Sequence, residues 1–466
     1  MEVTVPQKVG QVLRMVFEAG FEIYIVGGAV RDLLLGRPIL DWDFTTNATP
    51  EEILRIFPEG FYDNKFGTVG ISFEEEMRPY EITTFRTEAE YTDSRRPISV
   101  EWGKSLNEDL IRRDFTINAM ALEPKLQISS PEKLASNGQT IVFSVVDLFE
   151  GRRDIEKKLI RAVGNPNERF AEDALRMMRA IRIASELGFA IETDTFAAIC
   201  ANSQTIANIS GERIREELFK ILKTEYVYDG LVLLRNSGIL GIILPEVVAG
   251  FGVEQASPGR HHVYDVGMHS FLATKFCSSN DPLVRLATLL HDCGKPMTYK
   301  KLPSGTITFY NHEVTGAAIV YKIANRLRLS KEQTKRLVTL VRWHQFSVDD
   351  RQTDSAIRRF MRRVGKENIA DMLALRTGDR LGGGAKETSW RLEKYKERIE
   401  QLSVTPFTIS DLAIDGNDIM KLLQVAPGPV VGKILSVLFE EVMEDPSLND
   451  PTYLAKRAGE LKNNVN

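Results

Sequence analysis

The segment that decides the N-terminal fold runs from Ile23 to Thr46 and reads IYIVGGAVRDLLLGRPILDWDFTT. Its first four residues are apolar and typical of a short strand, and the pair Gly27-Gly28 lets backbone N–H groups approach a phosphate. Residues 29 to 35 are then expected to form a helix that carries Arg31 and Asp32. The segment contains neither GxGxxG nor a Walker motif, so it indicates neither a dinucleotide-binding fold nor a P-loop NTPase.

Two aspartates, Asp41 and Asp43, begin 13 residues after Gly28. At positions i and i+2 of a strand their carboxylates would point to the same side and could hold Mg²⁺ between them, with substrate phosphates as further ligands. Most isolated pairs of this kind are solvated turn residues. Here GGAVRD precedes the pair and RRDFTINAMA, residues 112 to 121, follows it, and this combination predicts a nucleotidyl-transfer site.

The residue types suggest how such a site would work. A metal ion held by Asp41 and Asp43 would bridge a triphosphate and lower the pKa of an attacking 3′-hydroxyl, while Arg31 and Arg113 would offer fixed positive charge to the phosphates. Glu81, on the next expected strand, could be a third carboxylate, although a cross-strand partner for arginine is the preferred interpretation. We expect Asp114 and Asn118 to fix the loop that carries Arg113.

Composition sets limits on function. The chain has 466 residues, enough for about three domains, and a net charge of only −4, so any RNA-binding surface must be a local patch. Residues 150 to 182, which are rich in arginine and lysine, are the best candidate stretch. The three cysteines, Cys200, Cys277 and Cys293, are too few for a disulfide framework, and no 18-residue apolar stretch occurs. A reducing, cytoplasmic location without membrane attachment is therefore expected.

Several motifs together resemble the bacterial class II tRNA nucleotidyltransferases, the CCA-adding enzymes of the DNA polymerase β superfamily. They are GGAVRDLLLGRPILDWDFTT, FGTVGIS, EITTFR, RRPISVEW, RRDFTINAMAL and RFAEDALRMMRAIRIASELGF, and the match extends from Tyr24 to about Leu222. The resemblance implies an α+β fold, with a small mixed β-sheet nucleotidyltransferase head followed by all-α neck, body, HD and tail domains. The expected boundaries are 1–145 for the head, 146–260 for the neck and body, 261–390 for the HD domain and 391–466 for a tRNA-binding tail.

The expected neck contains charged residues at every third position, namely Asp173, Arg176, Arg179 and Arg182. This spacing predicts one amphipathic helix over residues 171 to 188. A carboxylate that accepts from an amino group, beside a guanidinium that donates to a ring nitrogen, can read cytosine and adenine and reject uracil and guanine. Asp173 and Arg176 match the family's base-reading motif EDxxR. Without the head motifs, a surface salt bridge worth a few tenths of a kcal/mol would be the preferred interpretation.

The resemblance further implies that Gly28, Arg31, Arg113, Asp173, Arg176, Arg179 and Arg182 bind the nucleotide, that Mg²⁺ is the cofactor, and that tRNA, CTP and ATP are the partners. Residues 84 to 97, TFRTEAEYTDSRRP, resemble the flexible loop with which the family switches from CTP to ATP. This loop favours addition of all of CCA, or of the terminal A alone. Bacterial poly(A) polymerases share the aspartate motif, but they carry a GRRFR-like signature where this chain has KFGTVG at residues 65 to 70, which favours tRNA as substrate.

A second group of candidates lies downstream. All six histidines fall between His261 and His344, and imidazole with carboxylate suits transition metals such as Ni²⁺, Co²⁺ or Mn²⁺. Their order resembles that of the HD phosphohydrolase superfamily, which implies a core metal site of His269, His291, Asp292 and Asp379, with His312 and His344 as ligands of a second ion. Lys295 could face a phosphate, and His261 and His262 are expected at the surface or the substrate entrance.

Two functions of other classes stay open at this point. If the HD part dominates, the chain is a metal phosphohydrolase whose head only binds nucleotides. If the head is inactive, the chain is an RNA-binding module. Neither the oligomeric state nor the HD substrate follows from the sequence, although a cyclic phosphate or 3′-phosphate at a damaged tRNA end fits by analogy.

Overall fold

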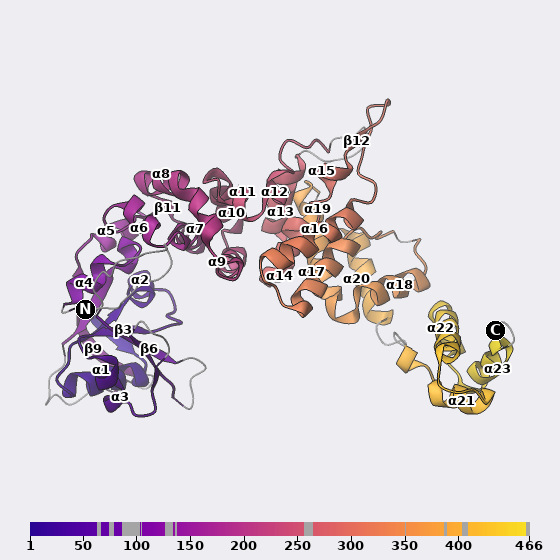
Figure 1. Cartoon of the computed structure of the whole chain (residues 1–466), viewed down its shortest axis with the longest axis horizontal. Coiled ribbons are helices and arrows are strands. Elements are labelled where there is room, and N and C mark those ends of the chain that lie inside the picture. Colours follow the sequence, from indigo (N-terminus) through magenta and orange to yellow (C-terminus); the bar gives the residue numbers. More distant parts are fainter. Residues whose placement is uncertain are drawn as a thin grey trace. The chain divides into compact units, whose positions relative to one another are not determined.

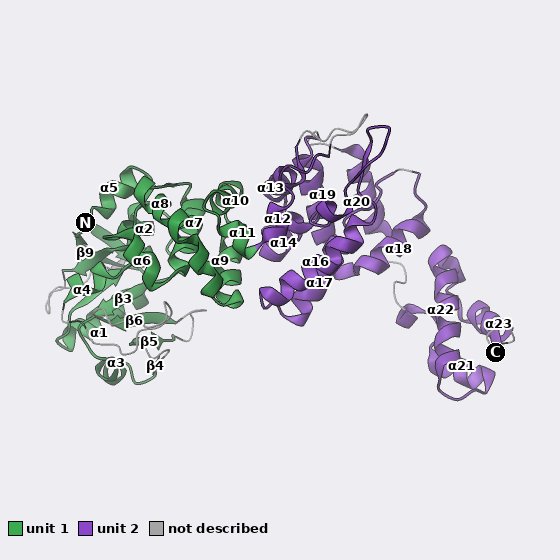
Figure 2. Ribbon diagram, turned by 45° about the horizontal axis from the view of Figure 1, so that its top comes forward, with its two compact units in different colours: residues 1–243 green, residues 244–466 purple. Residues whose placement is uncertain are grey.

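The computed structural model describes residues 1–62, 67–73, 79–85, 103, 105–125, 134–135, 138–255, 264–349, 351–385, 389–402 and 409–462. They form two compact units, Met1–Ile243 and Leu244–Asn466, which Figure 2 shows in different colours. The unit boundary falls before the expected start of the HD domain at residue 261. The finer division into head, neck, HD domain and tail stays a prediction.

The first unit begins with a nine-stranded sheet of order β1-β9-β7-β2-β3-β6-β5-β4, with β8 paired to β9. Only β3 and β6 are parallel neighbours, so the sheet is mixed, as expected. The strands are β1 (Glu2–Val5), β2 (Ile23–Val26), β3 (Asp43–Thr46), β4 (Phe61–Tyr62), β5 (Thr68–Ile71), β6 (Tyr80–Thr84), β7 (Met120–Pro124), β8 (Leu134–Ala135) and β9 (Gly138–Asp147).

Helices α1 (Gln7–Glu18), α2 (Gly28–Leu34), α3 (Pro50–Ile56) and α4 (Leu106–Ile111) accompany this sheet. Helix α1 buries Val9, Val12, Leu13 and Val16 in the same apolar cluster as Ile25 and Phe44 of the sheet, because this spacing places them on one helical face. Helix α3 begins at a capping box formed by Thr49 and Glu52. The strand and helix expected on either side of the glycine pair are therefore both present.

The rest of the first unit is mostly helical (Figure 1). It contains α5 (Gly151–Glu156), α6 (Pro166–Glu172), α7 (Leu175–Leu187), α8 (Thr193–Asn202), α9 (Gly211–Lys223), α10 (Val227–Asn236) and α11 (Ile239–Ile243). One parallel pair, β10 (Leu159–Ile160) with β11 (Ala190–Ile191), interrupts the expected all-α character of this part.

The expectation of a single helix over residues 171 to 188 is wrong. The chain leaves the helical conformation at Asp173, which has φ −146° and ψ 104° and ends α6. The Asp173 Oδ1 atom then accepts a hydrogen bond from the Leu175 backbone N–H at 3.0 Å, at the start of α7. A carboxylate that bonds to a nearby backbone N–H stabilises a helix start better than a helix interior.

The second unit is helical apart from the short hairpin of β12 (Lys300–Lys301) and β13 (Ile307–Thr308). Its helices are α12 (Pro245–Val248), α13 (Val266–Phe276), α14 (Pro282–Leu290), α15 (Lys295–Thr298), α16 (His312–Arg326), α17 (Lys331–Trp343), α18 (Asp354–Val364), α19 (Ile369–Gly382), α20 (Trp390–Leu402), α21 (Gly416–Leu423), α22 (Pro429–Glu444) and α23 (Pro451–Lys462). The last three helices share an apolar core of their own, which includes Ile419, Ile434, Leu438 and Leu454.

Two glycines bring α19 close to α13. A Cβ atom on Gly378 would lie 2.5 Å from the Ala273 carbonyl oxygen, and one on Gly382 would lie 2.5 Å from the Ala273 nitrogen. Since Asp379 lies between these glycines and His269 belongs to α13, the close approach brings their side chains together.

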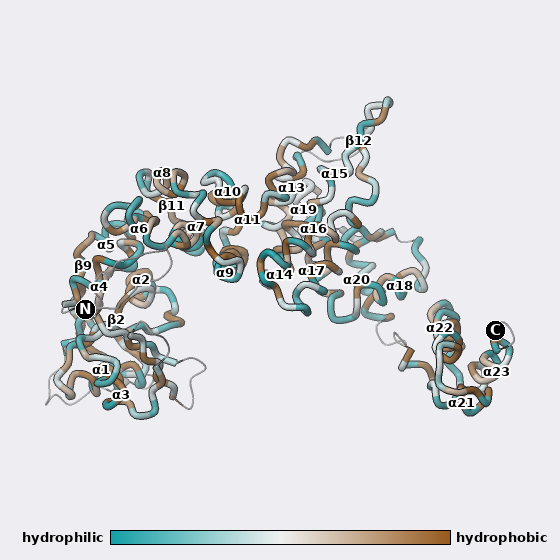
Figure 3. Tube along the Cα trace, in the orientation of Figure 1, coloured by the Kyte–Doolittle hydropathy of each residue, from teal (hydrophilic) through white to brown (hydrophobic). Residues whose placement is uncertain are grey.

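Hydropathy alternates along the helices of both units, where Figure 3 shows brown and teal stretches following one another. This alternation is typical of helices that bury one face. Among the helices that the structure describes, none combines the length and the apolar character that a membrane crossing requires.

Candidate functional site

The first unit contains a cavity of about 610 Å³ where the sheet meets α7 and α9. Six of the expected site residues line it, namely Gly28, Asp43, Arg113, Asp173, Arg176 and Arg179. Carboxylates and arginines together line its wall and make it a charged site. Its size is that of a typical small-molecule pocket.

Asp43 is the first residue of β3 and lies next to Val26 of β2 and Glu81 of β6 in the strand register. Burial raises the pKa of Asp43, and the neighbouring Asp41 carboxylate raises it further, against the opposing effect of Arg113. Asp41 itself is exposed and precedes the strand, so the expectation that both aspartates lie within one strand is wrong. Repulsion between these carboxylates is the condition that a bound divalent cation relieves, so the residues present fit Mg²⁺.

Gly27 is the residue whose backbone requires glycine. It has φ 74° and precedes α2, and a Cβ atom there would lie 3.1 Å from Arg113 Nη1 and 3.5 Å from Asp43 Oδ2. Gly28 has more room, since its nearest neighbour would be Arg31 Nη2 at 3.6 Å. The turn therefore keeps the space between Asp43 and Arg113 open, as a phosphate-binding site needs.

A carboxylate that sequence reasoning missed holds Arg113 in place. Asp109, which is buried, accepts from Arg113 Nη2 at 2.9 Å. The signal was present in the sequence, because Asp109 and Arg113 have the i, i+4 spacing of a helical ion pair.

Arg31 does not belong to the described lining of the cavity. Its side chain is buried and donates to Asp32 and, at 3.1 Å, to Asn118 Oδ1. Asn118 in turn donates to Asp114 Oδ1 at 3.3 Å, and Asp114 Oδ2 accepts from Arg179 Nε at 2.8 Å. Arg31 thus supports the loop after Arg113, a position that differs from the direct phosphate contact expected for it.

Asp114 is the centre of this network. Burial alone would raise the pKa of the Asp114 carboxyl, but Arg179 and Arg176 outweigh it and hold the pKa below its usual value. Asp114 in turn raises the pKa of Arg179, more than burial lowers it. The pair stays charged at neutral pH and fixes Arg179 at the cavity wall, in keeping with the structural role expected for Asp114 and Asn118.

The expected base-reading residues, Asp173 and Arg176, both line the cavity but have different partners. Asp173 Oδ2 accepts from Arg213 Nη2 at 2.7 Å, while Arg176 Nη1 donates to Glu172 Oε2 at 2.6 Å. Arg213, on α9, also lines the cavity and was missed, because a contact over 40 residues leaves no periodic signal in the sequence.

Arg182 also lies apart from the cavity lining that the structure describes. Its Nε atom is 2.8 Å from Glu217 Oε2 of α9, and the Glu217 side chain is buried. This ion pair joins α7 to α9, so the structure places Arg182 between helices, where the sequence had suggested a nucleotide contact.

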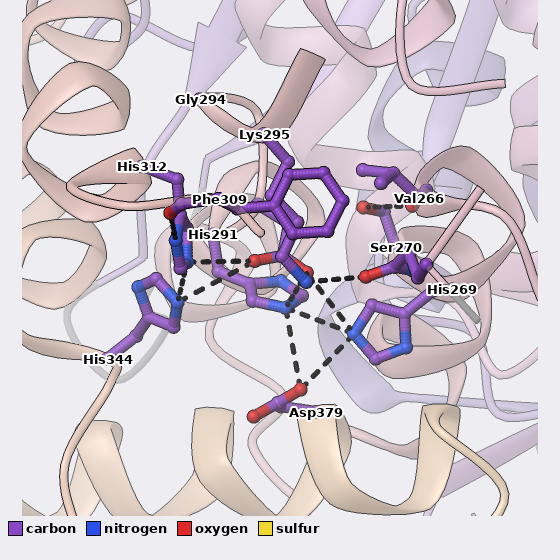
Figure 4. A network of polar contacts seen from close by, with 12 residues as sticks. Val266, His269, Ser270, His291, Gly294, Lys295, Phe309, His312, His344 and Asp379 are labelled. Carbon is purple, nitrogen blue, oxygen red and sulfur yellow. Dashed lines mark hydrogen bonds and ion pairs between the residues drawn. The ribbon is translucent and has the colours of Figure 1, made fainter. Parts of the chain in front are cut away.

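In the second unit, all six expected metal ligands come together (Figure 4). His269 and Asp379 lie on one side of His291, and His312 and His344 lie on the other side. They form two triads, His269 with His291 and Asp379, and Asp292 with His312 and His344. The residues come from α13, the end of α14, α19, the start of α16 and the end of α17.

Asp292 connects the two triads through its two oxygens. Its Oδ2 atom lies 3.1 Å from His291 Nε2 and 3.5 Å from His269 Nε2. Its Oδ1 atom lies 3.4 Å from His312 Nε2 and 3.7 Å from His344 Nε2. A carboxylate in this position is suited to bridging two cations.

The hydrogen bonds of three imidazoles show that these sites fit metal ions. The Nδ1 atoms of His291, His312 and His344 donate to backbone carbonyls at 2.7, 2.9 and 2.7 Å. In neutral rings the Nε2 atoms then carry lone pairs, yet His312 Nε2 and His344 Nε2 face each other at 3.3 Å beside a carboxylate oxygen. Buried acceptors that converge without a donor are satisfied by a cation.

The charges around the centre also fit the binding of metal ions. Although burial would lower it, Asp292 and Asp379 raise the pKa of His291 to about 10. Burial lowers the pKa of His344 to about 3, with His291 adding to the effect. Lys295 is buried and its Nζ atom lies 2.6 Å from Asp292 Oδ2. A proton on His291 and the Lys295 ammonium supply positive charge where metal ions would otherwise balance the carboxylates.

Some expected residues lie outside the described part of the chain. These are His261 and His262, residues 86 to 97 of the expected switching loop, and Lys65 with Phe66. Their expected roles stay predictions.

Three family models match the chain. Their descriptions are "Poly A polymerase head domain" over residues 23–161, "Probable RNA and SrmB-binding site of polymerase A" over residues 188–250, and "tRNA nucleotidyltransferase domain 2 putative" over residues 313–458. Together the three matched ranges include residues of both units.

Several curated relatives are named as CCA-adding enzymes. A CCA-adding enzyme of Limosilactobacillus fermentum is 34% identical over 453 residues, which cover 97% of this chain and 96% of the relative. A CCA-adding enzyme of Geobacillus thermodenitrificans is 46% identical over 229 residues, so the chain spans about half of that relative (52%). Among solved structures, the Bacillus stearothermophilus CCA-adding enzyme in complex with CTP has a TM-score of 0.68 and 27% identity, with 97% of this chain and 96% of that chain covered.

Proposed function

The chain belongs to the CCA-adding enzyme family, and we propose that it adds C and A to the 3′ end of tRNA from CTP and ATP without a nucleic-acid template, releasing pyrophosphate. One observation carries the proposal. A single cavity contains the carboxylate Asp43, the arginines Arg113 and Arg179, and the base-reading candidates Asp173 and Arg176. These groups would serve the metal, the triphosphate and the base.

In the reaction, the tRNA 3′-oxygen forms a bond to the α-phosphorus, the bond from that phosphorus to the β-phosphate oxygen breaks, and the hydroxyl proton is released. Mg²⁺ held by Asp41 and Asp43 would lower the pKa of the hydroxyl and offset the charge that develops on pyrophosphate. Arg113, fixed by Asp109, and Arg179, fixed by Asp114, would hold the phosphates. No covalent intermediate with the protein is needed.

Base choice would rest on Asp173 and Arg176. The Asp173 carboxylate accepts from the amino group of cytosine or adenine, and Arg176 donates to the adjacent ring nitrogen. Uracil and guanine present a carbonyl and an N–H in these places, which leaves the Asp173 carboxylate and the Arg176 guanidinium without a partner on the base. Asp173→Ala should therefore let UTP or GTP compete.

The test uses purified protein, Mg²⁺ and labelled CTP or ATP with tRNA that lacks its CCA end, and with tRNA that ends in CC. Incorporation of both nucleotides supports full CCA addition. Incorporation of A on the second tRNA alone would show an A-adding enzyme, long A tails would show a poly(A) polymerase, and no incorporation would leave only a binding function for the head.

We further propose that the second unit contains an HD-type metal centre, which would hold Ni²⁺, Co²⁺ or Mn²⁺. This centre would hydrolyse phosphate esters such as cyclic or 3′-terminal phosphates of RNA. The convergence of His312 Nε2, His344 Nε2 and Asp292 Oδ1 carries this proposal. Bound ions would polarise the phosphoryl group and lower the pKa of water. Lys295 would contact a phosphate oxygen, while the water oxygen bonds to phosphorus, the ester bond breaks and a water proton ends on the released hydroxyl.

Hydrolysis of 2′,3′-cyclic AMP and 3′-AMP, measured with each metal, tests this second function. His291→Ala combined with Asp292→Ala should abolish hydrolysis and leave CTP and ATP incorporation intact, while Asp43→Ala should do the reverse. Failure of the unmodified protein to bind any of these metals by elemental analysis would show that the cluster is structural. A cytoplasmic location, among tRNA substrates, fits both functions.

A further inference from the structure

Helix α15 and the segment that joins it to α16 contain exposed large side chains shortly before the proposed ligand His312. Met297 is 74% exposed, Tyr310 is 76% exposed and Tyr299 is 39% exposed. Single exposed apolar residues are common on protein surfaces and need no explanation. Here, however, the three lie in the 14-residue segment from Met297 to Tyr310, which includes the β12–β13 hairpin and leads directly into the ligand His312.

Contacts tie this segment to the centre. The Tyr299 ring lies 5.9 Å from the Phe309 ring, and the Lys295 Nζ atom lies 5.4 Å from the Phe309 ring. The Phe309 carbonyl accepts from His312 Nδ1 at 2.9 Å and so orients a metal ligand. Figure 4 shows Phe309 in front of the centre, next to Lys295 and His291.

Tyr310 follows Phe309 and precedes Asn311, whose backbone is left-handed with φ 60°. Two peptide units separate Tyr310 from His312, so their Cα atoms are at most roughly 7 Å apart. An exposed tyrosine therefore stands two residues before a proposed metal ligand. The left-handed backbone of Asn311 sets the direction of the chain between Tyr310 and the start of α16.

Charge in this segment fits the same ligand. Lys300 and Lys301 are exposed on β12, and Lys295 reaches the centre itself. Aromatic side chains beside cations are the combination with which proteins bind single-stranded nucleic acid, since every base can stack and every phosphate can pair.

We propose that Tyr299 and Tyr310 form a base-stacking platform, which makes the metal centre selective for the phosphorylated 3′ ends of RNA over phosphate esters without a base. This inference rests on the proposed phosphohydrolase function and adds the residues that would select its substrate. The terminal phosphate binds at Lys295 and the metal ligands, and the terminal base stacks on a tyrosine.

The first experiment compares 3′-AMP with ribose 3-phosphate, which lacks the base, on the metal-loaded full chain. Stacking is expected to give 3′-AMP a kcat/KM advantage of roughly ten- to hundredfold. Tyr310→Ala or Tyr299→Ala should reduce this ratio through KM while hydrolysis of ribose 3-phosphate is unchanged, and Tyr310→Phe should retain the ratio. Tyr321→Ala is the matched control, because Tyr321 is 56% exposed but lies further along α16.

Hydrolysis of ribose 3-phosphate with no advantage for 3′-AMP would overturn the platform and leave the phosphohydrolase function standing. Absence of all hydrolysis would refute that function. In that case a second experiment tests whether Tyr299 and Tyr310 contact an RNA 3′ end. A short single-stranded RNA with a 3′-phosphate and a terminal 5-iodouridine is photo-crosslinked to the full chain. Crosslinks at Tyr299 or Tyr310, lost in the alanine variants, support the inference, and crosslinks confined to other residues overturn it.

Discussion

Asp173 accepts a hydrogen bond from Arg213 at 2.7 Å, although Arg176 lies only three residues further along the chain. The carboxylate expected to read the base is therefore oriented from α9, while Arg176 is held by Glu172. Because each has its own partner, the Asp173 carboxylate and the Arg176 guanidinium do not pair with each other. Direct pairing would occupy the acceptor and the donor that a base needs.

The first prediction concerns this anchor. Arg213→Ala should reduce kcat/KM for CTP by roughly tenfold or more, because a hydrogen bond between charged groups contributes about 1.5–3 kcal/mol, and it should let UTP compete. Incorporation of all four nucleotides is the measurement, and Arg213→Lys should restore part of the selectivity. Arg215→Ala, on the same helix with Glu212 and Glu216 as partners, serves as the control. Unchanged selectivity in Arg213→Ala would assign the orientation of Asp173 to other groups.

The second prediction concerns Asp41 and Asp43, the carboxylates proposed to hold Mg²⁺. Asp43→Ala and Asp41→Ala should each lower nucleotide addition by at least about a hundredfold, since loss of metal charge stabilisation costs several kcal/mol. Binding of tRNA, measured by gel shift, should change little. Near-normal incorporation by the Asp41 variant would restrict the metal site to Asp43, which alone of the two lines the cavity.

The third prediction is a dependence of stability on pH. The pKa of Asp114 is lowered in the folded protein, so its ion pair stabilises the fold above the unfolded value near pH 4, and this contribution is lost as the pH falls through the folded value. Asp114→Asn should cost about 2 kcal/mol at pH 7, and the difference from the unmodified protein should shrink below about pH 4. Pulse proteolysis, which distinguishes fragments of the two units, is the measurement. A difference that is constant from pH 7 to pH 3 would contradict the assignment.

The fourth prediction concerns a substitution that should disturb the metal centre without replacing any of the proposed ligands. A Cβ atom on Gly294 would lie 2.1 Å from the His312 carbonyl oxygen and 2.7 Å from the Gly316 nitrogen, so Gly294→Ala must move α16 away from Asp292. We expect loss of metal from the second triad, measured as bound metal per chain. Gly432→Ala is the matched control, because its Cβ atom would meet nothing within 4 Å. Equal metal content in the two variants would show that the helix can shift without disturbing His312.

The fifth prediction separates the two triads. His344→Ala removes a ligand of one triad only and should reduce bound metal from two ions per chain to one, whereas Asp292→Ala, at the bridging position, should remove both. Metal analysis after gel filtration provides the measurement. Complete loss of metal in His344→Ala would indicate that the two sites bind cooperatively, and no loss would exclude His344 as a ligand.

The sequence alone determined the features that depend on neighbours in the chain. The apolar run before Gly27, the helix after it and the aspartates that follow are local signals, and a strand and helix formed where these signals lie. The metal cluster of His269, His291, Asp292 and Asp379 was implied by the resemblance to the HD phosphohydrolase superfamily, since these residues are far apart in the chain. Local rules succeed here because backbone conformation and motif spacing act over a few residues.

Only the tertiary structure decided which charged groups from distant parts of the chain are partners. Arg213 reaches Asp173 from 40 residues away, Arg182 pairs with Glu217 of another helix, and Arg31 supports Asn118 from inside the protein. The break at Asp173 and the bridging position of Asp292 were equally beyond a periodicity argument. The physical reason is that a buried charge takes whichever opposite charge the packing of other elements brings within hydrogen-bond distance, and that distance is set by the fold and not by separation along the chain.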